Sequence, residues 1–278
     1  MTTRTRAPRG VSRTAVLTAA ARAAEHERPD RLFADPFAGE LVEAAGGVAD
    51  LSGVCGLAGE HFVLRTRFFD DVLLRATALG CAQVVLVAVG LDARAHRLPW
   101  PGGTTVFEVD LPELIDFKDA VLASAVPACH RVVVPADLRG RWPDALLAAG
   151  FDPRRSTAWL VEGVLMFLRP DEAAGLLDRI GLLSAPGSRL AVEHVNGAFR
   201  RLPQMREVHR QFSKLDAEWY SHVDDPDTWL TGHGWVPEVA DESALAAASG
   251  RPAPGITDPR RVGDARIWLV DAQMSRSD

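Results

Sequence analysis

Residues 61–122 decide the fold of this 278-residue chain, because they contain four characteristic segments in a fixed order. The segment HFVLRTRFFDDVLL (61–74) is typical of a helix, and QVVLVAVG (83–90) is typical of a buried strand. The turn GLDARAHRL (90–98) follows, and TTVFEVDLPE (104–113) predicts a second strand that ends in carboxylates. This order predicts two neighbouring strands of a parallel sheet, joined by a crossover.

Gly90 precedes Asp110 by 20 residues. In a βαβ unit this spacing puts a carboxylate at the tip of the second strand, beside the turn that follows the first. Such a carboxylate can accept hydrogen bonds from both ribose hydroxyls of a nucleoside. The turn lacks the later glycines of a G-x-G-x-x-G dinucleotide motif, and the chain has no G-x-x-x-x-G-K-[ST] phosphate loop. The pattern therefore favours a nucleoside without phosphates, and S-adenosylmethionine (SAM) fits better than a nicotinamide dinucleotide.

Beyond residue 80, short apolar runs alternate with helix signals, which predicts a doubly wound α/β sheet. Pro112, Pro143 and Pro170 are each followed by an acidic residue, a pattern that suits the first turn of a helix. Residues 244–248 are expected to be helical, between the last two strands. Seven strands are expected, at residues 83–89, 104–109, 131–135, 157–161, 188–195, 235–239 and 265–272.

The chain before residue 80 is expected to be helical. Ser12 is predicted to cap a helix that runs to about His26, Asp35-Pro36 to open a second, and a third to begin near Glu60. We therefore expect an N-terminal helical cap at residues 1–80 and a SAM-binding Rossmann-like core at 81–278. A polar, helix-prone stretch at about 197–227 is interpreted as a lid insert after strand five.

Composition excludes some partners. The net charge of -6 argues against a nucleic-acid surface, and no apolar run reaches the roughly 18–20 residues that would span a membrane. A basic run near the N-terminus (Arg4, Arg6, Arg9 and Arg13) is interpreted as a solvated arm. We expect neither nucleic acid nor membrane as a partner, and a monomer or homodimer.

The cysteines and histidines indicate the compartment and argue against a metal site. Cys55, Cys81 and Cys129 are widely spaced and odd in number, which is typical of a protein in the reducing cytoplasm. The histidines are scattered and show no ligand spacing beside cysteines, so no metal is expected.

The chain resembles the SAM-dependent methyltransferases related to leucine carboxyl methyltransferase. Within that family it is most similar to the bacterial, largely actinobacterial branch that includes tetracenomycin-type polyketide O-methyltransferases. The resemblance covers nearly the whole chain, and it is carried by DP at 35–36, RTRFFD at 65–70, GLDAR at 90–94, FEVDLP at 107–112, ADLR at 136–139, EGVL at 162–165 and VEH at 192–194. It implies a class I methyltransferase fold, SAM as cofactor, and methyl transfer to an oxygen of a small molecule, a polyketide-type phenol or carboxylic acid.

Arg65 shares an apolar helix face with Phe69 and Val72. A charge in that position needs an anionic partner, because burying it unpaired is costly. The resemblance implies that this partner is the methionine carboxylate of SAM, and an ion pair within the protein is the alternative. Arg67 has Asp70 and Asp71 three and four residues further on, so a solvated ion pair explains it.

The remaining cofactor residues follow from the strand ends. Gly90 lets the backbone approach a ligand, while Ala88 stands where the family usually has glycine. Asp110 is the ribose candidate, with Leu111 beside it and Glu108 as the less favoured choice. By resemblance, Asp137 accepts from the adenine amino group, Leu138 offers a backbone N–H, and Glu162 faces the methionine amino group. Helix capping by the acids is the alternative.

The acceptor side is less defined by the sequence. His194, at the end of the fifth strand, is the candidate general base, followed by His209 and His222, and a structural role is the alternative for each. The family often has tyrosine where Phe167 stands, which makes methylation of a protein C-terminal carboxyl group less favoured. Trp219 and Tyr220 either wall an apolar planar acceptor or pack the lid. Ala88 and Phe167 also leave open a non-catalytic protein that binds SAM or its product, as a sensor or scaffold.

Overall fold

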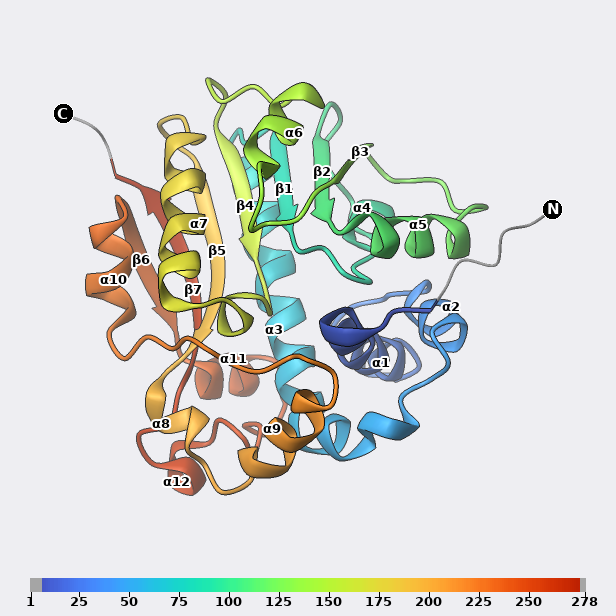
Figure 1. Ribbon diagram of the computed structural model, residues 1–278, viewed down its shortest axis with the longest axis vertical. Helices are drawn as coiled ribbons and strands as arrows, with labels where there is room; N and C mark the ends of the chain where they lie inside the picture. The colour runs from blue at the N-terminus through green and yellow to red at the C-terminus, as the bar shows by residue number, and fades with distance from the viewer. Residues whose placement is uncertain (1–6, 276–278) are drawn as a thin grey trace.

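Seven strands form one mixed sheet in the computed structural model, which describes residues 7–275 (Figure 1). Their order is β3-β2-β1-β4-β5-β7-β6, and β7 alone runs in the opposite direction to the other six. This confirms the predicted seven-stranded doubly wound sheet. The order in which the chain adds strands to the sheet reverses between β1 and β4. Open α/β sheets form ligand sites at such a reversal. The strands are β1 (Gln83–Val87), β2 (Thr105–Asp110), β3 (His130–Pro135), β4 (Thr157–Val161), β5 (Arg189–Val195), β6 (Trp235–Ala240) and β7 (Ile267–Met274).

Helices cover both faces of the sheet. One face packs against α6 (Trp142–Ala148), α7 (Pro170–Leu182) and α10 (Pro226–Gly232), and the other against α3 (Ser52–Ala78). Successive strand residues point to opposite faces, so Val85 and Trp159 pack toward α7 while Leu86 and Leu160 pack toward α3. Because both faces of the sheet are covered, strands β1 and β4 carry apolar side chains on both sides. The remaining short helices on the α3 side include α4 (Arg94–Arg97) and α11 (Glu242–Ala248).

The proline signals correctly predicted three helix starts. Helices α5 (Pro112–Val121), α6 and α7 each carry proline in the first turn, followed by Glu113, Asp144 or Asp171. A proline there forfeits no intrahelical hydrogen bond, and the acids meet the positive end of the helix dipole. The helix predicted at 244–248 is also present, as part of α11.

The N-terminal helices differ in detail from the prediction. Ser12 caps no helix, because it lies inside a 3-10 helix (Gly10–Thr14) that continues directly into α1 (Ala15–His26). Asp35 does open the next helix: its Oδ1 accepts from the amides of Phe37 and Ala38 at 3.2 Å each, just before α2 (Ala38–Ala44).

Helix α3 begins at Ser52 rather than near Glu60. Three glycines in its first two turns hide the helix in the sequence, since glycine disfavours helix by about 1 kcal/mol per residue. Burial of Leu51, Val54 and Ala58 in the core outweighs that preference.

The N-terminal segment is fixed to the body of the protein, which corrects the prediction for Arg13. Its guanidinium donates to the carbonyls of Ala45 (2.9 Å) and Gly47 (2.6 Å) and pairs with Asp50. Arg9 is exposed, and Arg4 and Arg6 lie outside the described residues. Helices α1 and α2 pack on α5 through a small apolar cluster of their own, whereas α3 packs on the sheet. The division at residue 80 stays a prediction.

The stretch at 197–227 contains α8 (Gly197–Arg200), α9 (Met205–Ser213) and an irregular segment that leads to α10. Figure 1 shows the carboxyl ends of β1, β2 and β4 pointing toward the part of the molecule that holds α1 and α9. In the described part of the chain, no single helix is long and apolar enough to cross a membrane. One bent pair, Ala38–Ala44 with Ala49–Ala78 at 100°, meets the test by length and composition only.

Candidate functional site

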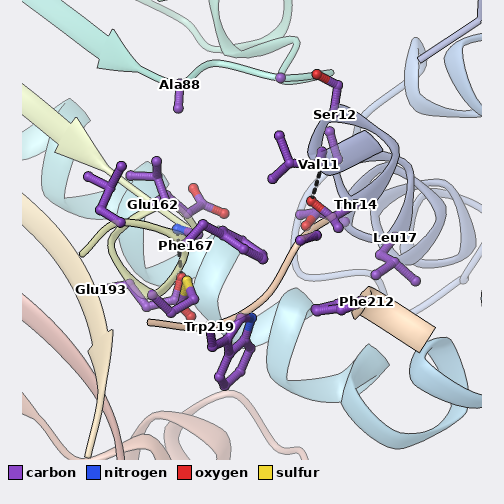
Figure 2. Close-up of a pocket in the computed structure, with 18 of the residues that line it drawn as sticks. Val11, Ser12, Thr14, Leu17, Ala88, Glu162, Phe167, Glu193, Phe212 and Trp219 are labelled. Atoms are coloured by element: carbon purple, nitrogen blue, oxygen red, sulfur yellow. Dashed lines mark hydrogen bonds between the residues drawn. The ribbon is translucent and has the colours of Figure 1, made fainter. Parts of the chain in front are cut away.

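A cavity of about 500 Å³ opens at the carboxyl ends of the strands. The turn after β1 and the ends of β2, β4 and β5 form its floor, while α1, α9 and residues 214–220 cover it. Figure 2 shows Glu162 and Glu193 on one side of this space, with Val11 and Thr14 opposite them. Its size is that of a small-ligand site. It brings together all eight predicted cofactor residues: Arg65, Ala88, Gly90, Asp110, Leu111, Asp137, Leu138 and Glu162.

The turn after β1 has a left-handed backbone at two positions. Gly90 has φ of 56°, and a Cβ there would lie 3.0 Å from the Cβ of Ala15 in α1. Glycine is therefore required both by the backbone and by the close approach of α1. Ala88 has φ of 53°, a conformation that costs a residue with a Cβ about 1–2 kcal/mol. The family's usual glycine at this position would remove that strain.

Asp110 is held rigidly beside this turn. Its Oδ2 accepts from the amide of Gly90 at 2.6 Å, and its Oδ1 accepts from the amide of Leu111 at 2.7 Å. Burial raises the pKa of the Asp110 carboxyl, while these two amides act in the opposite direction. Each carboxylate oxygen keeps further acceptor capacity on the cavity side. Glu108, the alternative, is fully buried against Lys118 and Arg131 and does not line the cavity.

Asp137 and Leu138 follow β3 at the outer end of the cavity. Asp137 is partly exposed and accepts from both the amide and the guanidinium of Arg139, at 2.9 and 2.7 Å. The hydrogen bond from the Arg139 side chain holds the pKa of Asp137 below its usual value. The acid therefore stays ionised at the rim, where a ligand amino group can meet it.

Arg65 meets carboxylates of its own protein. Its Nη1 lies 2.8 Å from Glu193 Oε2, its Nε lies 2.9 Å from Glu162 Oε1, and its Nη2 donates to the hydroxyl of Thr18 at 3.0 Å. The internal ion pair left open by the sequence is thus present. A contact with a ligand carboxylate stays a prediction. The pair predicted for Arg67 is confirmed with Asp71 at 2.8 Å, but Asp70 turns inward instead.

Arg94, the last residue of the GLDAR motif at 90–94, has a role that the sequence did not predict. It is fully buried and pairs with Asp92, with Asp70 at 2.6 Å and with Glu162 at 2.7 Å. Both oxygens of Glu162 are therefore held, one by Arg65 and one by Arg94. An arginine in a turn that follows an apolar strand is the signal that points to such a buried network.

His61 was missed altogether. Its imidazole is 2% exposed and lies between Glu242 (2.8 Å) and Glu193 (3.2 Å). Burial opposes its charge, but the two carboxylates outweigh burial and raise the pKa of His61 to about 9. It is the one histidine that lines the cavity among the described residues, and as an imidazolium it cannot act as a base. The sequence did carry one sign of this role: His61 precedes Arg65 by four residues, which puts both side chains on the same helix face.

The far end of the cavity is aromatic. The Phe167 ring lies 6.0 Å from Phe212 and 6.3 Å from Trp219, which also stacks on Phe199. Figure 2 shows Phe167 extending into the space between Glu162 and Phe212. Trp219 and Tyr220 both line this part of the wall. Such a surface suits a planar apolar ligand.

The charges that line the cavity are unbalanced. Eight acidic and five basic side chains line it among the described residues. Four of the five bases have an acidic partner, and Arg169 at the exposed rim lies over the ring of Tyr220. The wall therefore favours a cationic or neutral ligand over an anionic one.

His194 does not reach the cavity, which corrects its assignment as general base. Residues of a strand alternate between faces, so Glu193 points to the cavity and His194 to the opposite side, against Trp229. It is 3% exposed, and burial lowers its pKa to about 4. His209 and His222 line a separate hollow behind Trp219. In residues 7–275 no group of three or more His, Cys, Asp or Glu residues is arranged to hold a metal ion.

Known proteins share this architecture. The sequence profile of the leucine carboxyl methyltransferase family matches residues 15–181. A protein of Frankia alni is 48% identical over 89% of this chain and 91% of its own length, and one of a Parafrankia species is 42% identical over 92% and 89%. Both are named putative S-adenosyl-L-methionine-dependent methyltransferases.

Solved structures agree on the fold. A DUF574 family protein from Streptomyces avermitilis superposes with a TM-score of 0.61 at 15% identity, covering 94% of this chain and 97% of its own. A putative methyltransferase from Thermobifida fusca superposes with a TM-score of 0.58 at 20% identity, covering 84% of this chain and 89% of its own. The sheet order and the cavity at the strand ends define the class I methyltransferase fold. The chain belongs to the leucine carboxyl methyltransferase family, as the resemblance implied.

Proposed function

We propose that this protein transfers a methyl group from SAM to a hydroxyl oxygen of an uncharged, planar small molecule of the polyketide-type phenol class. Family membership supports the SAM-dependent methyltransferase. One observation carries the choice of acceptor: an acid-lined half of the cavity continues into an aromatic half, and the cations deep in the cavity are already paired.

The cavity residues fit SAM in charge and shape. The excess of acids suits a ligand with a sulfonium and an ammonium group, and the fixed Asp110 carboxylate suits a ribose. In this proposal Asp110 holds the ribose, Asp137 and Leu138 the adenine, and Arg65 with Glu162 the methionine end. When bound, SAM would supply a methyl group activated for in-line displacement; the acceptor hydroxyl would release its proton to solvent, and S-adenosylhomocysteine would be the second product.

The protein's own contribution is positioning and exclusion of water. Phe167, Phe212 and Trp219 would hold the acceptor ring against the cofactor half, and α9 with residues 214–220 covers that contact. Holding two reactants in line and away from water accounts for much of the rate of such transfers. A carboxylate acceptor, whether free or at a protein C-terminus, would need a cation of its own. The N–H groups that Arg65 keeps beyond Glu193 and Thr18 are assigned here to the methionine carboxylate and cannot serve both, so these two acceptors are less favoured.

One observation favours a second candidate, a protein that binds SAM or its product without turnover. Ala88 has a strained left-handed backbone in the turn where the cofactor would lie, and this residue lines the cavity. A misplaced cofactor would still bind but would not react.

Two measurements separate these candidates. Calorimetric titration with SAM, with S-adenosylhomocysteine and with NAD as a control tests the cofactor. We expect micromolar binding of the first two and none of NAD. Incubation with methyl-labelled SAM and a panel of phenols then tests turnover. Binding without label transfer to any acceptor would favour the non-catalytic protein, and absence of SAM binding would reject both.

A further inference from the structure

Four buried side chains form a line of alternating charge at the cavity wall: Glu242, His61, Glu193 and Arg65, the last three of which line the cavity. Each is at most 6% exposed. His61 Nδ1 donates to Glu242 Oε1 at 2.8 Å, His61 Nε2 donates to Glu193 Oε1 at 3.2 Å, and Arg65 Nη1 donates to Glu193 Oε2 at 2.8 Å. The line joins three elements that are far apart in the sequence. His61 on α3 lies 132 residues before Glu193 on β5 and 181 residues before Glu242 on α11.

His61 makes this arrangement possible. Two buried carboxylates with no charge between them would be costly, and one would take up a proton. The imidazolium donates to both at once, so Glu193 can remain ionised: burial opposes its charge, but Arg65 and His61 lower the pKa of Glu193 to about 2. Glu242 holds the other side of the ring and fixes its orientation.

Glu193 in turn fixes Arg65. Its Oε2 accepts from Arg65 Nη1 and from the amide of Gly163, both at 2.8 Å. Thr18 accepts from Nη2, and Glu162 forms an ion pair with Nε, so the planar guanidinium has partners on three sides. Gly163, with φ of 67°, lies beside this contact, and a Cβ there would be 3.5 Å from Arg65 Nη1. Buried Glu193 and half-buried Glu162 and Thr18 together set the orientation of Arg65.

We propose that Glu193 and His61, anchored by Glu242, are positioning residues that orient Arg65 for the methionine carboxylate of SAM. Both line the cavity beside Arg65, and in this proposal they act on the ligand through its guanidinium, so that α11 is tied to cofactor binding through Glu242. The inference rests on the proposed function, because it takes SAM as the ligand. A merely structural network would instead stabilise the fold without regard to which part of a ligand is bound.

Three ligands distinguish these roles. SAM carries the whole methionine end, whereas 5′-methylthioadenosine has the same adenosine but lacks the carboxylate, the amino group and the sulfonium charge. Decarboxylated SAM lacks the carboxylate alone. We expect His61→Gln and Glu193→Gln to weaken SAM binding at least about tenfold while the affinities for methylthioadenosine and decarboxylated SAM stay within about twofold, measured by calorimetry. Arg189→Gln is the matched control: Arg189 also lies on β5 and pairs with the buried Asp271, but it does not line the cavity. It should change none of the three affinities.

An equal loss of affinity for SAM and methylthioadenosine, or no loss for either, would overturn the positioning role of His61 and Glu193. Glu242→Gln tests the same point with a milder change, since its amide oxygen still accepts from His61, and it should shift the SAM affinity selectively and by less. If the unaltered protein binds methylthioadenosine but not SAM, or neither, the proposed function itself fails, independently of any variant.

Discussion

Replacing Asp110 with alanine removes the carboxylate that the structure holds at the end of β2, beside the turn after β1. The side chain is 8% exposed and accepts from the amides of Gly90 and Leu111, so its remaining acceptor sites face the cavity. Charge-assisted hydrogen bonds to a ribose contribute about 1.5–3 kcal/mol, and 1.4 kcal/mol corresponds to a factor of ten. We therefore expect SAM affinity to fall between about tenfold and a hundredfold.

The assay is calorimetric titration of Asp110→Ala with SAM and with 5′-methylthioadenosine. Both ligands contain the ribose, so both affinities should fall together, in contrast to the selective effect expected at His61. Glu113→Ala, an exposed acid in the first turn of α5 outside the cavity, is the control and should bind normally. Unchanged binding by a folded Asp110→Ala protein would refute the ribose assignment.

Three further outcomes follow from the geometry. Ala88→Gly should raise the free energy of unfolding by about 1 kcal/mol in urea titration, because glycine adopts φ of 53° without strain, and a destabilised variant would contradict this. The pKa of His61 is raised from 6.5 to about 9 in the folded protein, so its stabilising contribution is complete below pH 6.5 and is lost as pH rises through 9. The unfolding free energy should fall more steeply over pH 7–10 in the unaltered protein than in His61→Gln, and parallel curves would reject the charged imidazole. Trp219→Ala should raise the KM for a phenolic acceptor at least about tenfold with SAM affinity unchanged, and an unaltered KM would remove the aromatic half from the acceptor site.

Local pattern predicted the features that depend on short-range rules. The apolar run at 157–161 matches β4 at both ends, since a strand buried on both faces shows as a continuous apolar segment. The spacing of Gly90 and Asp110 predicted that the carboxylate lies beside the turn, because the tips of adjacent parallel strands lie side by side. The structure has it there, and in addition the amide of Gly90 donates to the carboxylate at 2.6 Å.

The features that the sequence did not predict share a physical cause, because each depends on tertiary contacts. The register of β5 places Glu193 rather than His194 in the cavity, and a strand covered on both faces gives no local sign of which face is which. His61 and Glu242 lie 181 residues apart, so their pairing has no local signature. Helix α3 begins at Ser52 because burial overrides the glycines of its first turns.

Methyl transfer to matched acceptor pairs tests the central claim most directly. Each pair would consist of a planar aromatic phenol and the carboxylic acid built on the same ring, incubated with methyl-labelled SAM, and mass spectrometry would locate the added methyl group. The aromatic, acid-rich cavity predicts methylation on the phenolic oxygen and little or none on the carboxylate. Preferential methylation of the carboxylic acids would contradict the account.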